Sequence, residues 1–407
     1  MLRRSRISRS IWRHREQGIT GRQAARRQAT LATEPEGHDL NGWRYRCGAG
    51  FVLAWLLAGF GSCQPENQAG PGAPPVGRDA PGPAGSGDGS ASIVPVTPDL
   101  SGFLAANRPA YRAALQRARA WLDDLQIDPI DLREKGMKGK KHLVEQLDAY
   151  YRLWKVAGDS QKTELLEPIR QVVEVTYEDR YHDMGSINSE WFKQDATSYL
   201  RAAVLMDRLG LDTRRYRDEI RRVLPRLNEQ MPQRGPHQQR TFHWYYQYFG
   251  LAEPFPLEGA LGKGVIASRT DPRAFSTGVV YELTHEIYAV YEFGDRLDVD
   301  PFGNEDKQYL RKTLNVLAVQ YTRQQDPDVL GEIIECMHYL RFSDEPAYSN
   351  GVIYLLRSQN ADGSWGKYPA QEKVLGPMVK IELQLHTTDV VIGTLTAVFD
   401  TPMPPLH

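Results

Sequence analysis

The chain has 407 residues, of which 41% are hydrophobic and 25% are charged, and its formal net charge at pH 7 is −1. These are ordinary values for a folded globular protein. A net charge this close to zero excludes the broadly basic character typical of nucleic-acid-binding proteins, so we expect no nucleic acid among the partners.

Basic residues crowd the first thirty positions, which hold nine arginines and a single acidic residue, Glu16. No aromatic or helical pattern accompanies them. We therefore interpret this arm as sequence that precedes a downstream start site near Leu40, in preference to a functional basic arm.

An uncharged, mostly apolar stretch covers residues 48–61 and follows Arg44 and Arg46. It is too short for a comfortable transmembrane helix but has the length of the hydrophobic region of a signal peptide. We expect residues 1–62 to form a basic N-terminus and a signal peptide, with an uncleaved membrane anchor as the alternative.

The residues that end this stretch and follow it, Gly61, Ser62 and Cys63, resemble a bacterial lipobox. The resemblance implies cleavage before Cys63 and lipidation of its thiol. Phe60 departs from the aliphatic residue that a lipobox usually has three positions before the cysteine. We therefore expect an extracytoplasmic lipoprotein, anchored through Cys63 to a bacterial membrane in the periplasm or at the cell surface.

Residues 64–98 are dominated by Pro, Gly, Ala and Ser and have almost no large apolar side chains. Such a segment cannot bury enough apolar surface to offset the entropy lost on ordering. We expect residues 63–98 to be the lipidated cysteine followed by a disordered tether that holds the remaining domain away from the membrane.

From residue 99 onward, the spacing of apolar residues predicts about twelve helices and few strands. The helices are expected at residues 104–125, 143–157, 163–177, 196–209, 216–231, 242–251, 257–268, 279–293, 307–324, 329–342, 348–359 and 386–399. We treat residues 99–407 as one all-helical domain.

The predicted helices alternate in character along the domain. Strongly apolar helices recur roughly every 40 to 55 residues, and a more charged helix separates each from the next. Apolar helices are expected inside and amphipathic helices outside. The alternation predicts an all-α fold, an α/α toroid of about six helical hairpins, with an open α-solenoid of the same hairpins as the alternative.

Residues 359–365 have the sequence QNADGSW, which follows the pattern QxxDGSW. This segment resembles the QW motif of terpenoid cyclases and protein prenyltransferase β-subunits, which are α/α toroids. The resemblance implies that the segment caps an outer helix and ties it to the next inner helix. Asp362-Gly363 is a turn sequence, and Trp365 is expected to pack on the preceding helix.

The segment Leu385-His386-Thr387-Thr388 is similar to the YHT segment of the prenyltransferase β-subunit, whose histidine is a zinc ligand. The resemblance covers roughly the last 130 residues. The DxDD and DDxxD motifs of terpenoid cyclases do not occur in the sequence, and the Asp-x-Cys zinc pair has no clean counterpart. The resemblance therefore implies the fold and His386 as a candidate ligand, but no isoprenoid chemistry.

Three candidate metal ligands, His285, Cys336 and His386, lie about one hairpin apart in successive apolar helices. Corresponding ends of the inner helices of a toroid meet at one mouth, so these side chains are expected to converge. Histidine nitrogen and cysteine sulfur are ligands that zinc prefers, so zinc is the candidate cofactor. His243 is a possible fourth group, and Glu286 is placed to orient a ligand or act as a base.

Other interpretations remain open. A metal-independent polysaccharide lyase or hydrolase would use aromatic platforms at 242–246 and an acid–base group drawn from Glu282, His285 and Glu286. A non-catalytic binding or assembly module would have a mouth without converging polar groups. Histidines in buried helices usually hydrogen-bond a neighbour, and a single buried cysteine is commonly inert. The substrate, whether a small molecule or a saccharide, is not predicted by the sequence.

Overall fold

The computed structural model describes residues 99–254, 257, 259 and 262–406. The predicted signal peptide, Cys63 and the tether lie outside the described residues. Every regular element in the described residues is helical, and no strand occurs among them. None of the helices searched in that part of the chain is long and apolar enough to cross a membrane.

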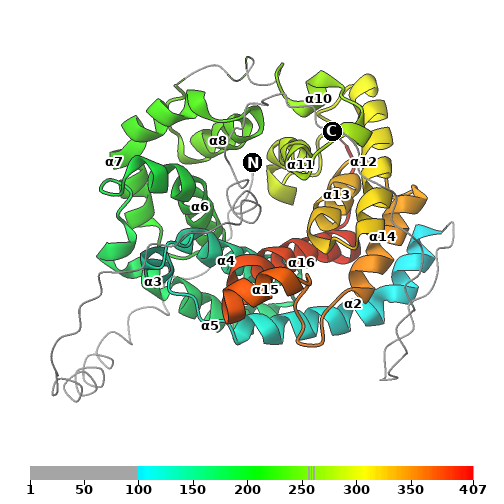
Figure 1. Cartoon of the computed structure of the whole chain (residues 1–407), viewed down its shortest axis with the longest axis horizontal. Helices are drawn as coiled ribbons and strands as arrows, with labels where there is room; N and C mark the ends of the chain where they lie inside the picture. The colour runs from blue at the N-terminus through cyan, green and yellow to red at the C-terminus, as the bar shows by residue number, and fades with distance from the viewer. Residues whose placement is uncertain (1–98, 255–256, 258, 260–261, 407) are drawn as a thin grey trace. The chain divides into compact units, whose positions relative to one another are not determined.

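Two sets of helices alternate along the chain and form an inner and an outer ring (Figure 1). The inner helices are α4 (Gly139–Val156), α6 (Ser189–Arg208), α8 (Pro236–Phe249), α11 (Thr277–Val290), α13 (Pro327–Tyr339) and α16 (Leu385–Asp400). The outer helices are α2 (Leu100–Asp123), α5 (Asp159–Val173), α7 (Arg214–Gln230), α10 (Val265–Ser268), α12 (Asn304–Gln324) and α14 (Pro346–Arg357). Each inner helix follows an outer one, which confirms the predicted six hairpins in the described part of the chain.

The composition of the helices explains which ring each of them joins. Helix α13 is buried over nearly its whole length, because apolar residues occur on every side of it. Helix α7 instead buries one stripe, Tyr216, Ile220, Val223 and Leu227, at helical spacing, and turns its arginines to solvent. A helix that is apolar all round belongs inside, and an amphipathic one covers it.

Several of the helix ends follow ordinary capping chemistry. Asp99 accepts hydrogen bonds from two backbone N–H groups in the first turn of α2, and Asn188 and Asp326 cap α6 and α13 in the same way. Helix α8 ends at Gly250, whose φ of 64° is a left-handed conformation that glycine adopts without strain.

The first and last hairpins meet, so the ring is closed. Helix α16 packs against both α13 and α4, and α2 contacts α14 and α16 (Figure 1). Arg108 of α2 pairs with Asp400 of α16 at 2.6 Å, and the rings of Tyr111 and Phe399 stack with centroids 4.5 Å apart. These contacts establish the closed toroid over the open solenoid.

The QxxDGSW segment holds this closure together. The Gln359 amide donates to the Ala114 carbonyl of α2 at 2.9 Å and to the Gly363 carbonyl at 2.8 Å. Trp365 is fully buried; its indole N–H donates to the Leu355 carbonyl of α14, and its backbone N–H donates to the Thr388 hydroxyl of α16. The predicted tie between an outer and the next inner helix is therefore confirmed, and it extends to α2.

Some element boundaries differ from the predicted ones. Helix α5 ends at Val173 and continues as a 3-10 turn, where the Thr176 hydroxyl donates to the Val173 carbonyl at 2.6 Å and competes with the helical bond. Helices α3 (Pro129–Glu134) and α15 (Pro369–Leu375) were not predicted, because they are too short to show a period.

A network of charges lies between α4, α13 and α16. The guanidinium of Arg152 is 3.0 Å from Glu335 and 3.4 Å from Asp389. It lies directly against the backbone of α16 at Gly393, where an added Cβ would overlap the guanidinium. A glycine in the middle of this helix costs helix stability, and the space for Arg152 is the reason for it.

We expect Gly393→Ala to lower the free energy of unfolding by about 1–3 kcal/mol, because the new methyl group overpacks a buried ion network. Urea denaturation followed by circular dichroism measures this change. Gly303→Ala is the matched control, since no heavy atom lies within 4 Å of its added Cβ. Equal stability of Gly393→Ala and the wild type would contradict the assigned packing.

Candidate functional site

Polar side chains from four inner helices meet where these helices begin. Figure 1 shows α4, α11, α13 and α16 surrounding one side of the central space. We call this cluster the N-terminal mouth and define it as Lys141, His142, Glu145, Tyr281, His285, Asp328, Glu332 and His386.

His386 lies between two carboxylates of the mouth. Its Nδ1 is 2.9 Å from Glu145 Oε1, and its Nε2 is 3.5 Å from Asp328 Oδ1. Burial opposes the protonated ring, but Asp328 and Glu145 outweigh burial and raise the pKa of His386 to about 9. The ring is therefore an imidazolium at neutral pH.

His285 has the opposite protonation state. Its Nδ1 lies 2.8 Å from the Tyr281 carbonyl, which can only accept, so Nδ1 carries the proton and Nε2 carries the lone pair. Burial lowers the pKa of His285 to about 4, and the positive charge of His386 adds to this effect. The two histidines are thus close enough to interact, as a neutral base and a cationic acid.

Glu332 adds a second proton donor to the mouth. It is buried and accepts a hydrogen bond from the Thr284 hydroxyl, and its Oε2 lies 3.8 Å from His285 Nδ1. Burial, followed by the negative charge of Asp328, raises the pKa of Glu332 to about 8. Asp328 in turn accepts a hydrogen bond of 2.6 Å from the Tyr281 hydroxyl.

Residues of α4 hold Glu145 in its ionised form. Lys141 Nζ is 2.9 Å from Glu145 Oε1, and His142 Nδ1 is 3.2 Å from Glu145 Oε2. Burial favours the neutral acid, but Lys141, His142 and His386 together hold the pKa of Glu145 well below its usual value. The mouth therefore contains a fixed anion, a neutral base and two proton donors.

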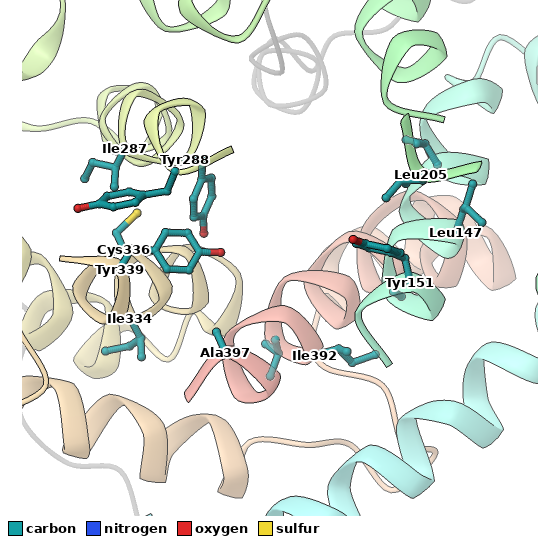
Figure 2. Packing of buried hydrophobic residues seen from close by; sticks show 14 of the residues in the cluster. Leu147, Tyr151, Leu205, Ile287, Tyr288, Ile334, Cys336, Tyr339, Ile392 and Ala397 are labelled. Atoms are coloured by element: carbon teal, nitrogen blue, oxygen red, sulfur yellow. The ribbon is translucent and has the colours of Figure 1, made fainter. Parts of the chain in front are cut away.

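Of the predicted metal ligands, the structure brings His285 and His386 to one mouth but leaves Cys336 apart. The Cys336 thiol is fully buried, lies 3.7 Å from the Thr284 carbonyl and points toward Ile287 and Tyr288 of α11 (Figure 2). Burial, with Glu332 and Glu335 nearby, raises the pKa of Cys336 well above its ordinary value, which disfavours the thiolate that binds metals.

The predicted zinc ligands do not form a binding set in this arrangement. Within the residues that the structure describes, no three or more His, Cys, Asp or Glu side chains are grouped so that they could hold a metal ion. His285 Nδ1 is directed to a backbone carbonyl, and Cys336 lies one helical turn beyond Glu332. Zinc at this place therefore remains a sequence-based prediction.

The other two predicted site residues lie away from the mouth. His243 pairs with Glu253 at 2.7 Å in the loop after α8. Glu286 accepts hydrogen bonds from the backbone N–H groups of Val265 and Ile266, so it caps the short helix α10. His285 and Glu286 are adjacent in sequence and therefore point in different directions from α11.

The aromatic residues at 242–246 are packing residues and not surface platforms. Phe242 and Tyr246 are fully buried, and Trp244 and Tyr245 are buried as well. Their rings contact one another and α11 neighbours such as Phe293. The buried aromatic rings of residues 242–246 therefore do not provide a stacking surface for a saccharide.

The sequence prediction missed Glu145, Asp328, Glu332, His142 and His237. His237 begins α8, and the centre of its ring lies 6.2 Å from that of His285. Burial, followed by the charge of His285, lowers the pKa of His237 to about 3. Glu145 and Glu332 lie in the first turns of the predicted inner helices 143–157 and 329–342, which is a signal that could have identified them, since these turns share one end of a toroid. His142, Asp328 and His237 precede the predicted helix starts, so this signal does not reach them.

A closed ring of six helical hairpins with titratable side chains gathered at one mouth defines an α/α toroid. The chain belongs to the family described as Domain of unknown function (DUF6895), whose model matches residues 111–380. The match begins within α2 and covers α4 to α13, so it includes His285, Asp328 and Glu332, and it ends shortly before α16. No curated protein and no solved structure matches the chain.

Proposed function

We propose that this protein is an extracytoplasmic lipoprotein whose toroid domain is a metal-independent acid–base enzyme. The apolar stretch at 48–61 and Cys63 support the extracytoplasmic, lipid-anchored location. The QxxDGSW segment supports a distant relation to the terpenoid cyclase and prenyltransferase toroids, which extends to the fold and not to the chemistry. The N-terminal mouth supports the enzymatic activity.

The observation that carries the proposal is the presence of His285 and His386 in one cluster, with their pKa values shifted in opposite directions. General acid–base catalysis needs a base and an acid that coexist at the working pH. His285 supplies the base through Nε2, since Tyr281 fixes its tautomer. His386 and Glu332 supply protons, and His386 retains its proton because Asp328 and Glu145 stabilise the imidazolium. Such polar convergence favours an enzyme over a non-catalytic module.

The proposed substrate is a saccharide, cleaved as a lyase or a hydrolase would cleave it. In a lyase reaction, His285 removes a carbon-bound proton while an acid of the mouth protonates the leaving oxygen. In a hydrolase reaction, the same base activates water. Hydroxyl-rich substrates match a mouth of mixed donors and acceptors, and such polymers are available outside the cytoplasm. The zinc-dependent alternative lacks a group of three ligands among the described side chains.

We expect the full-length protein in detergent to cleave a member of a panel of neutral and acidic polysaccharides, and His285→Gln to lower kcat/KM about a hundredfold. New reducing ends report either reaction, and the absorbance of an unsaturated sugar identifies a lyase. His243→Gln is the matched control, because His243 lies outside the mouth, and it should retain activity.

Three further outcomes of this experiment discriminate between the alternatives. Activity that survives a chelator supports the metal-independent reaction, and its loss, restored by zinc, would favour the zinc enzyme. Absence of cleavage across the panel with a folded wild type would remove the saccharide proposal. Activity should also follow the membrane fraction in the wild type and leave it in Cys63→Ser.

A further inference from the structure

A pocket lies near the opposite ends of the inner helices, away from the N-terminal mouth. It is a small pocket that opens to solvent, with about 30 Å³ of space accessible to a water-sized molecule. Arg152, Lys155 and Arg201 line it, together with Tyr151 and Tyr339, which face one another across it (Figure 2). We call it the basic pocket. It shares no residue with the N-terminal mouth.

The carboxylates in the basic pocket are already engaged. Asp148 accepts hydrogen bonds from Arg201 Nη2, at 3.0 and 2.9 Å, and from Arg201 Nε, at 3.2 Å. Glu335 lies 3.0 Å from Arg152 and accepts a hydrogen bond from the Tyr339 hydroxyl. Both carboxylates are therefore neutralised by guanidinium groups, and three cations face two anions in the lining of the pocket.

Arg201 retains an unused donor in this pocket. Its side chain is only 9% exposed, and its Nη1 has no hydrogen-bond partner among the described residues. A buried donor without a partner costs free energy, so such groups usually have a partner in the functional state. An acceptor from a bound molecule would satisfy it.

Lys155 lines the pocket, and Arg208, outside the lining, shares the carboxylate of Asp295 with it. Both lie in the last turn of an inner helix, where the helix dipole favours cations. Burial, together with Arg152 and Arg208, lowers the pKa of Lys155 to about 8. The helix dipole favours these two cations, and the ion pair with Asp148 explains the position of Arg201, but neither gives Arg201 Nη1 a partner.

The carboxylate of Asp295, which follows the lining residue Gly294, accepts from both of these cations. Lys155 Nζ donates to Asp295 Oδ1 at 2.7 Å, and Arg208 also donates to this carboxylate. The preceding residues Glu292, Phe293 and Gly294 have φ values of 50°, 56° and 86°. Left-handed conformations at Glu292 and Phe293 cost about 1–3 kcal/mol each. Contacts around the segment therefore have to offset this backbone strain.

We propose that the basic pocket binds the oxyanion of a small ligand, a phosphate or a carboxylate, which replaces Asp295 between Lys155 and Arg208 and accepts from Arg201 Nη1. Guanidinium and ammonium groups recognise both oxyanions through charge-assisted hydrogen bonds. Asp295 is then an internal competitor that leaves when the ligand binds. This site is independent of the reaction proposed at the other mouth.

Isothermal titration of the full-length protein in detergent with inorganic phosphate, and separately with glucuronate, tests the proposal. At least one of the two should bind saturably, and the comparison identifies the preferred oxyanion. Lys155→Gln should weaken that binding roughly tenfold. Asp295→Asn should strengthen it severalfold, because the internal competitor loses its charge.

Lys312→Gln removes one lysine charge from the exposed face of α12 and should leave binding unchanged. The opposite effects of Lys155→Gln and Asp295→Asn separate a specific site from a general effect of charge. The proposal is overturned if neither anion binds to the wild type or to a folded Asp295→Asn variant. It is equally overturned if Lys155→Gln and Lys312→Gln bind as the wild type does.

Discussion

Trp365→Ala is expected to lower the free energy of unfolding by about 3–5 kcal/mol, among the largest effects of a single substitution in this fold. The side chain is fully buried, and its indole N–H donates to the Leu355 carbonyl at 2.8 Å. Its removal leaves a cavity beside α14 and removes one of the two side-chain hydrogen bonds to the Leu355 carbonyl, which the Ser358 hydroxyl also contacts at 3.2 Å. Because this segment joins the last hairpin to α2, the loss weakens the closure of the ring. Urea denaturation measures the change.

Trp365→Phe is the matched variant for this prediction. It retains most of the apolar volume but removes the hydrogen bond to Leu355, so we expect a smaller loss of about 1–2 kcal/mol. Equal losses for both variants would mean that packing of the ring contributes little. A stability of Trp365→Ala within 1 kcal/mol of the wild type would show that the segment does not hold the closure.

The sequence was sufficient to predict the fold because the relevant signals are local and repeated. Helices such as 216–231 and 386–399 were predicted nearly as found, since each has a long apolar period, whereas α6 begins at Ser189, well before the predicted 196. The QxxDGSW segment predicted one tie, from α14 to α16. Its second tie, from Gln359 to Ala114, joins residues 245 positions apart and has no signature in the sequence around either one.

Only part of the candidate site was predictable. His285 and His386 were found because histidines are rare and occur one hairpin apart. The same argument failed for Cys336, because a repeat fixes which helix a residue joins but not its height along the helix axis. Glu332 lies one turn, about 5.4 Å, closer to the mouth than Cys336. Carboxylates such as Glu332 were missed because acidic residues are common on helices, and their burial depends on tertiary contacts.

The free energy of unfolding is expected to fall by up to about 3 kcal/mol as pH rises from 6.5 to about 9, because His386 then loses its proton. In the folded protein its pKa is about 9, against an ordinary value of 6.5. A group whose pKa is raised by folding stabilises the fold fully below its unfolded pKa, and this contribution is lost as pH rises through the folded pKa.

Glu332 contributes with the same sign but over a lower range. Its pKa is raised from 4.5 to about 8, so the folded state binds its proton more tightly, and the associated stability is lost as pH rises from 4.5 to about 8. The two groups therefore overlap between pH 6.5 and 8. Variants that remove one group at a time, His386→Gln and Glu332→Gln, separate the two contributions.

Urea denaturation at intervals from pH 5 to 10 provides the measurement, and the histidine resonances in NMR report the pKa of His386 directly. His386→Gln should flatten the profile near pH 9, where most Glu332 side chains have lost their proton. An unchanged slope there would mean that Asp328 and Glu145 do not stabilise an imidazolium. The acid half of the proposed catalytic pair would then be absent, and His285 would have only Glu332 as its partner.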